Sequence, residues 1–276
     1  MLTKTSVRFY EYLMSKQFSD ITVRHYMGDL RKFLEHLQSV CRNPIYATES
    51  DVRQVIYHYA MDHRLQTKTL VCILAVVKQF YRFLYRNKLI DTDPTVGIEY
   101  PKLKTSKIIP LTQEQIEQVV NASFKDRDRL IVELFHYTGI RRAELLNIRV
   151  CEIDFDRKQI LINGKGNKQR YVPFNEKLHR MLKEYIGRHG ISRNLIRIKE
   201  RRIDCIFEEI SRKVGFRVHP HMLRHAYASE LYRKTKDVLL IKKLLGHSNI
   251  ATTSRYLESL SALDDHDMES YRKVFG

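Results

Sequence analysis

The hydrophobic positions in the first third of the chain recur at helical spacing. Between residues 19 and 37 they fall three and four apart, at Val23, Tyr26, Leu30, Phe33, Leu34 and Leu37. This spacing places them on one face of a helix, and Ser19 stands where a helix N-cap is expected. Residues 51–64 and 67–88 have similar patterns. We therefore expect a bundle of four or five helices over residues 1–98.

The pattern stops at residues 99–110, EYPKLKTSKIIP. This stretch has two prolines, three lysines and no apolar periodicity, which is typical of an extended basic linker. Thr112 and Gln115 then have the spacing of a capping box, which opens a new helix. The sequence thus predicts a second domain over residues 111–276.

The second domain combines helices with a small sheet. One helical pattern stops at Thr138 and Gly139, and another begins at once. Apolar and polar residues then alternate in CEIDFD, KQILIN and KQRYVPF, around the glycine-rich GKGN. Such alternation predicts antiparallel strands, and helical patterns fill the remainder. The expected fold is mostly α with a small antiparallel β-sheet: an N-terminal helical bundle followed by an α+β domain.

The net charge of the chain indicates what kind of partner it binds. Lys and Arg number 49 against 32 Asp and Glu, a formal charge of +17. The excess is concentrated in residues 157–213, which hold 16 basic and 6 acidic residues. Such a surface attracts polyanions, so we expect double-stranded nucleic acid ahead of an anionic membrane. The sequence has neither a run of about 18 apolar residues nor a signal-peptide pattern, which predicts a cytoplasmic protein without a membrane span.

The four cysteines are scattered. Cys41, Cys72, Cys151 and Cys205 include no C-x-x-C pair. A zinc site or a disulfide framework is therefore not expected, and buried free thiols are the default.

The segment HPHMLRHAYASEL, residues 219–231, is the first candidate for chemistry. Pro220 suits the first position of a helix, and His221 and Arg224 would share one face of it. Arginine offers two parallel donors to phosphate oxygens, and histidine can exchange a proton. A metal site of His219, His221 and His225 is an alternative, although a neighbouring guanidinium would repel a cation. Ordinary packing of these residues is the third possibility.

Two further segments carry isolated basic residues. In TGIRRAELL, Gly139 allows a turn and Arg141 falls at a helix start, where free N–H groups favour anions. Glu144 could hold that side chain or face water. At the hairpin tip, Lys165 stands between two glycines and could reach into a DNA groove. As a general acid it would need a lowered pKa or a very close leaving oxygen. Each of these residues could equally be a solvated charge.

The segment LLGHSNIATTSRYLE completes the set. Gly246 is expected to stop a helix, with His247 in the corner and Tyr256 on the next helix. A tyrosine at helical spacing is more often a core residue than a catalyst. Taken together, however, two arginines, two histidines, a lysine and a tyrosine suit attack of a phenol oxygen on a phosphodiester. The arginines would neutralise the charge that a metal ion otherwise neutralises, and a covalent intermediate would conserve bond energy for rejoining.

With these four motifs in this order, the sequence resembles the tyrosine recombinase (phage integrase) family, and most closely its compact Xer-type members. The resemblance covers essentially the whole chain. It implies that Tyr256 is the nucleophile, that it forms a 3′-phosphotyrosyl bond and that it releases a 5′-hydroxyl. The other implied catalytic residues are Arg141 and Arg224 as a phosphate clamp, Lys165 as the acid for the leaving oxygen, His221 in proton transfer and His247 as a phosphate ligand.

The resemblance also implies partners and assembly. It predicts no cofactor, metal ion or ATP, and DNA contacts from Arg142, Lys168 and Arg170. The two domains would form a C-shaped clamp on double-stranded DNA. Four copies would join two DNA sites and exchange strands through a Holliday junction. A final helix would dock on a neighbouring copy through Met268, Tyr271, Val274 and Phe275.

Two other functions stay open at this point. A type IB topoisomerase uses the same chemistry but acts as a monomer, so the apolar side of the final helix disfavours it. A protein that only binds DNA would not need a positioned tyrosine.

Overall fold

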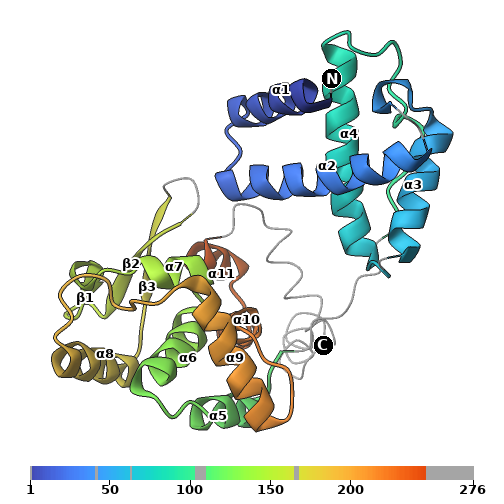
Figure 1. Cartoon of the computed structure of the whole chain (residues 1–276). Helices are drawn as coiled ribbons and strands as arrows, with labels where there is room; N and C mark the ends of the chain where they lie inside the picture. Colours follow the sequence, from blue (N-terminus) through green and yellow to red (C-terminus); the bar gives the residue numbers. More distant parts are fainter. Residues whose placement is uncertain (1, 41–42, 63, 103–109, 165–167, 247–276) are drawn as a thin grey trace, which may run out of the picture. The chain divides into compact units, whose positions relative to one another are not determined.

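The computed structural model describes residues 2–40, 43–62, 64–102, 110–164 and 168–246. The predicted residues Lys165, His247 and Tyr256, and the predicted final helix, lie outside these ranges. The chain divides into two compact units, Met1–Thr105 and Ser106–Gly276 (Figure 1). The division falls within the basic stretch 99–110. Ile98 belongs to the core of the first unit and Leu111 to the core of the second.

The first unit is a bundle of α-helices, as predicted. Its described helices are α1 (Leu2–Ser15), α2 (Asp20–Val40), α3 (Glu49–Asp62) and α4 (Thr67–Arg86), with a 3-10 turn, η1 (Pro44–Tyr46). Helix α2 contacts α1, α3 and α4 (Figure 1). At its start, the Oγ atom of Ser19 accepts a hydrogen bond from the backbone N–H of Thr22 at 3.3 Å. The predicted cap is therefore present.

Apolar packing holds the first unit together. The predicted face of α2 is buried at Val23, Leu30, Phe33, Leu34 and Leu37, while Tyr26 is partly buried against the same core. Helix α4 adds Phe80 and Tyr81, both almost fully buried. Burial of each large apolar side chain stabilises the fold by roughly 1.5–3 kcal/mol.

The second unit combines helices with a small sheet. Its elements in chain order are α5 (Gln113–Asn121), α6 (Asp126–Thr138), α7 (Arg142–Asn147), η2 (Val150–Glu152), β1 (Ile153–Asp154), β2 (Gln159–Asn163), β3 (Gln169–Pro173), α8 (Glu176–His189), α9 (Glu200–Val214), α10 (Pro220–Thr235) and α11 (Val238–Leu245). The predicted capping box opens α5: Thr112 accepts from the N–H of Gln115, and the Gln115 side chain accepts from the N–H of Thr112.

The strands form an antiparallel sheet in the order β1-β2-β3. Ile160 pairs with Val172, and Asn163 pairs with Gln169 at the turn end of the β2–β3 hairpin. Ile160, Ile162 and Val172 are buried in the core of the unit. Helix α6 is almost wholly buried and contacts α5, α8 and α10. The mostly helical fold with a small antiparallel sheet is thus confirmed.

One expectation about the cysteines is wrong. Cys72 and Cys151 are exposed and Cys205 is half-buried, although all three are free. Cys72 lies on α4 just before the buried Ile73 and Leu74, so it falls outside the apolar face of that helix. Cys41 lies outside the described residues.

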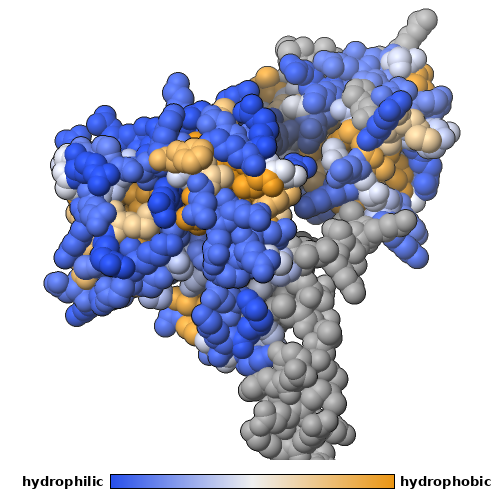
Figure 2. Space-filling view, turned by 90° about the horizontal axis from the view of Figure 1, so that it is seen from below, coloured by the Kyte–Doolittle hydropathy of each residue, from blue (hydrophilic) through white to orange (hydrophobic). Residues whose placement is uncertain are grey.

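Hydrophilic residues cover most of the face of each unit that is visible in Figure 2, with small apolar areas between them. Among the helices that the structure describes, none combines the length and the apolar character that a membrane crossing requires.

Candidate active site

Helix α6 ends in a turn that only glycine fits. Gly139 has φ 59° and ψ 22°, in the left-handed region. A Cβ atom there would lie 2.5 Å from Cδ1 of Tyr227 and 2.9 Å from Cδ2 of Leu245. Both backbone conformation and packing therefore require glycine. The turn leads directly to Arg141, which is the N-cap residue of α7.

Glu144 holds Arg141 in place. The backbone N–H of Arg141 donates to Oε2 of Glu144 at 2.8 Å, and its Nη1 donates to Oε1 at 2.8 Å. The Nη2 group of Arg141 donates to the carbonyl of Gly246 at 3.1 Å. About a third of the Arg141 side chain, 36%, is still exposed. This arginine is therefore both fixed and accessible.

Helix α10 supplies the second arginine. It begins at Pro220, as predicted, and it packs along α6. Arg224 is only 3% exposed. Its Nη1 group donates to the carbonyl of Gly139, and its Nη2 group donates to the carbonyl of Leu245 at 2.9 Å.

Arg170 of β3 is the third arginine at the same point. Its Nε donates to the carbonyl of Leu244 at 2.7 Å. Arg170, Arg224 and Arg141 thus donate to three consecutive carbonyls, those of residues 244, 245 and 246. The last carbonyls of a helix have no partner within it and carry the negative end of its dipole, so guanidinium groups stabilise them. Helix α11 ends at Gly246 with φ 64°, the predicted stop.

The carboxylate of Glu144 lies beneath these arginines. It is 5% exposed and forms two further hydrogen bonds with Arg170, at 2.9 and 2.8 Å. Burial raises the pKa of this carboxyl, but the hydrogen bonds and charges of Arg170 and Arg141 outweigh burial and lower the pKa to about 2. Glu144 is therefore ionised at neutral pH.

His221 lies close to the same charges. Desolvation by the surrounding protein lowers its pKa, and the positive charges of Arg224, His219, Arg142 and Arg141 lower it further. The imidazole is therefore neutral at pH 7 and can accept a proton.

The phenol of Tyr227 is a useful contrast. It lies against Gly139, and burial raises its pKa to about 12. It therefore remains protonated at neutral pH.

A cavity of about 1150 Å³ opens between β3 and α11. Its basic lining residues are Arg141, Lys168, Arg170, Lys242 and Lys243. Its apolar wall is formed by Tyr171, Leu239 and Leu240. The cavity reaches Gly246 and Arg141, so an anion entering it would meet the exposed guanidinium.

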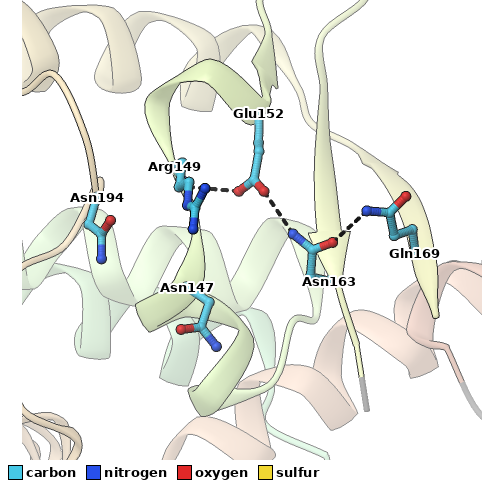
Figure 3. A pocket seen from close by; sticks show the side chains of 6 residues that line it. All are labelled: Asn147, Arg149, Glu152, Asn163, Gln169 and Asn194. Atoms are coloured by element: carbon cyan, nitrogen blue, oxygen red, sulfur yellow. Dashed lines mark hydrogen bonds between the residues drawn. The ribbon is translucent and has the colours of Figure 1, made fainter. Parts of the chain in front are cut away.

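A second, polar cavity of about 440 Å³ lies beside the turn end of the β2–β3 hairpin (Figure 3). Gln169 lines both cavities. Its Nε2 donates to Oδ1 of Asn163 at 2.8 Å, and Nδ2 of Asn163 donates to Oε1 of Glu152 at 2.7 Å (Figure 3). The N–H of Gly164 donates to the carbonyl of Lys168 at 2.8 Å. These bonds fix the two strand ends on either side of residues 165–167.

The structure brings three of the six predicted catalytic residues together: Arg141, His221 and Arg224. The other three lie outside the described residues. The alternative of a histidine metal site gains nothing from the part of the chain that the structure describes, where no three His, Cys, Asp or Glu residues are placed to hold an ion.

The three predicted DNA-contact residues differ in their surroundings. Lys168 is exposed. Arg142 is bound by two acids of α9, with its Nε 2.6 Å from Oε1 of Glu200 and its Nη1 on Asp204. Arg170 is 10% exposed and its described bonds are internal. Sequence reasoning thus did not find that Arg170 shares the inner face of β3 with Val172, two residues on. The period-two alternation of the strand was the available signal.

The chain is similar to known proteins over most of its length. Residues 110–262 match the phage integrase family, and residues 7–88 match the phage integrase N-terminal SAM-like domain. The chain is 33% identical to tyrosine recombinase XerC of Lactobacillus delbrueckii subsp. bulgaricus over 272 residues, covering 90% of this chain and 92% of the relative. It is 30% identical to tyrosine recombinase XerC of Bacillus subtilis, with 90% and 89% covered.

Solved structures share the fold. The lambda integrase fragment of residues 75–356, bound to DNA, superposes with a TM-score of 0.78 at 17% identity, covering 96% of this chain and 98% of that one. XerH recombinase bound to its difH substrate gives 0.68 at 21% identity, covering 88% and 80%. The chain therefore belongs to the phage integrase family, and it is an Xer-like site-specific tyrosine recombinase, an enzyme that cleaves and rejoins DNA strands.

Proposed function

We propose that the end of α11 is the binding site for the scissile phosphate of double-stranded DNA. The observation that carries this proposal is the placement of Arg141 and Arg224 on adjacent carbonyls, those of Gly246 and Leu245, at the edge of a basic cavity. Two guanidinium groups at one point neutralise the charge that develops on phosphoryl oxygens. In this proposal His247, the next residue of the chain, is a further hydrogen-bond donor to the same phosphate.

The cleavage step follows from these positions. The phenol oxygen of Tyr256 attacks phosphorus, a 3′-phosphotyrosyl bond forms, and the bond from phosphorus to the 5′ oxygen breaks. His221 accepts the phenol proton, and Lys165 donates a proton to the leaving 5′ oxygen. Rejoining is the reverse reaction, with a 5′-hydroxyl of another strand as the nucleophile. The step consumes neither a metal ion nor ATP.

The basic surface supports a DNA partner more broadly. Lys168, Lys242 and Lys243 line the cavity beside Arg141, and their contacts with phosphates would make binding fall steeply with salt. The first unit, which matches the family's N-terminal domain, would bind the flanking DNA. Four copies on two DNA sites form the active assembly in this proposal, as in the lambda integrase tetramer bound to a Holliday junction. Such an enzyme would act in the cytoplasm.

Covalent trapping tests the proposal. DNA sites would be selected by the protein from a random-sequence library, nicked close to each candidate phosphate, and incubated with protein in the presence of EDTA. An adduct that survives SDS is expected with the wild-type protein and with Tyr227→Phe, the matched control, but not with Tyr256→Phe. Tight binding with no adduct on any nicked site would contradict the proposal, as would an adduct that persists in Tyr256→Phe.

A further inference from the structure

Arg170 occupies an unusual place for a basic residue of a DNA-cleaving enzyme. It follows the hairpin tip by a few residues, yet 90% of its side chain is inaccessible to solvent, since only 10% is exposed. Its guanidinium donates to both carboxylate oxygens of Glu144 and its Nε donates to Leu244. The three bonds use all three nitrogens of the guanidinium.

The pair of Arg170 and Glu144 is more than a surface ion pair. Both side chains are at most 10% exposed, so the hydration that each loses has to be replaced by its protein partners. Removal of the arginine would leave a buried carboxylate with Arg141 as its remaining described charged partner. The geometry is also specific, because the planar fork of arginine matches both oxygens and a lysine cannot reproduce it.

This one guanidinium joins three elements. It lies on β3, it holds the carboxylate that fixes Arg141 at the start of α7, and it holds the last turn of α11. Contact with α11 is close: a Cβ atom on Gly246 would lie 2.9 Å from Nη1 and 3.2 Å from Cδ of Arg170. Any residue but glycine would therefore displace either the end of α11 or the Arg170 side chain.

We propose that Arg170 is a positioning residue for strand cleavage: it holds Glu144 and the end of α11 so that Arg141 and Arg224 face one phosphate. This inference rests on the proposed function of the site. It assigns Arg170 to the internal support of the site instead of the DNA contact that the sequence suggested.

The first test separates binding from chemistry. In Arg170→Met, the cleavage rate at saturating nicked DNA is expected to fall about 100-fold, since a displacement of about 1 Å costs that much. The dissociation constant for the same DNA should change less than about threefold, because the cavity keeps its exposed lysines. Arg170→Lys should fall between Arg170→Met and wild type. Arg180→Met, which removes an exposed arginine of α8, is the matched control and should cleave normally.

The second test uses pH. Without Arg170, the pKa of Glu144 should rise, because burial raises it and Arg141 alone remains to lower it. A protonated Glu144 cannot hold Arg141 through both oxygens. The ratio of the Arg170→Met rate to the wild-type rate should therefore fall as the pH falls from 7 to 5. The effect of His221 titration on the rate is common to both proteins, so it cancels in this ratio. In the double variant with Glu144→Gln this fall should disappear.

The outcomes are distinct. If wild-type protein forms no adduct, the proposed function fails and Arg170 is not the cause. If wild type cleaves and Arg170→Met cleaves equally fast, or loses affinity alone, the positioning role is wrong. If Arg170→Met does not fold by circular dichroism, the Arg170→Lys variant decides: a normal cleavage rate there would overturn the proposal.

Discussion

Among the described residues, the first unit buries two polar side chains, Thr5 and Thr95, while the second unit buries four charged ones. These four are Asp128, Glu133, Glu144 and Arg224. Burial of an ion costs several kcal/mol unless a partner compensates for the lost hydration. The first unit avoids this cost, and the second accepts it both on α6, at Asp128 and Glu133, and at the end of α11. The contrast indicates that the buried charges of the described residues, which lower stability unless they are paired, are confined to the unit that contains the proposed catalytic site.

The two buried glutamates of the second unit differ in their partners and in what those partners hold together. Glu144 has two arginine partners, which donate four hydrogen bonds to its carboxylate and lower its pKa to about 2. Glu133, fully buried on α6, has Lys177 of α8 within 2.6 Å as its partner. The ion pair of Lys177 with Glu133 joins α8 to α6 in the core, whereas the arginines that bind Glu144 belong to the proposed phosphate site.

The largest expected effect concerns His221 in the second unit. His221→Gln should lower the cleavage rate about 10³-fold, within the range for loss of a general acid–base group. Because the pKa of His221 is below 6.5, the wild-type rate should stay level near pH 7 and fall as the pH drops below 6.5. Single-turnover cleavage from pH 5 to 8 measures both. An acid limb that persists unchanged in His221→Gln would assign it to another group.

Next in size is the stability that Glu144 contributes. A folded pKa of about 2 against an ordinary 4.5 corresponds to about 3 kcal/mol at pH 7. Because the folded pKa is the lower one, this stability is complete well above pH 4.5 and is lost as the pH falls toward 2. Glu144→Gln should therefore be less stable at pH 7, with a gap that narrows in acid. Hydrogen exchange in peptides of the second unit measures it, and a gap independent of pH would contradict the ion-pair account.

The smallest effect is expected in the first unit. Ile73, on α4, is 4% exposed in an apolar core. Ile73→Val should lower the stability of this unit by about 1 kcal/mol, the usual cost of one buried methylene. The cleavage rate at saturating DNA should not change. A loss of cleavage rate as large as that of a site variant would contradict this prediction, because it would show that the core of the first unit also affects the chemical step.

The sequence predicted the parts of the fold that local rules govern. The apolar face of α2, the capping box at Thr112 and the glycine stops at Gly139 and Gly246 are all set by neighbours a few residues away, and all are present. The pairing of His221 with Arg224 on one helix face follows from the same short spacing.

Contacts between residues that are far apart in the sequence could not be predicted from these local rules. Arg142 and Asp204 are 62 residues apart, and Arg170 and Leu244 are 74 apart, so no spacing along the chain reveals either bond. Both arginines were predicted to contact DNA from the resemblance to the family, which does not show the acids that surround them. Burial of Arg170 depends on which acid the fold brings beneath it, and only the tertiary structure supplies Glu144.

The central claim is that arginines neutralise the scissile phosphate, and substrate charge tests it most directly. Cleavage by Arg141→Ala would be measured on a normal phosphate and on a methylphosphonate at the same position, with exposed Arg157→Ala as the control. On phosphate the rate should fall about 10²–10³-fold, as for loss of one oxyanion donor. On the uncharged methylphosphonate most of that loss should disappear, because less charge develops there. An equal loss on both substrates would contradict the claim.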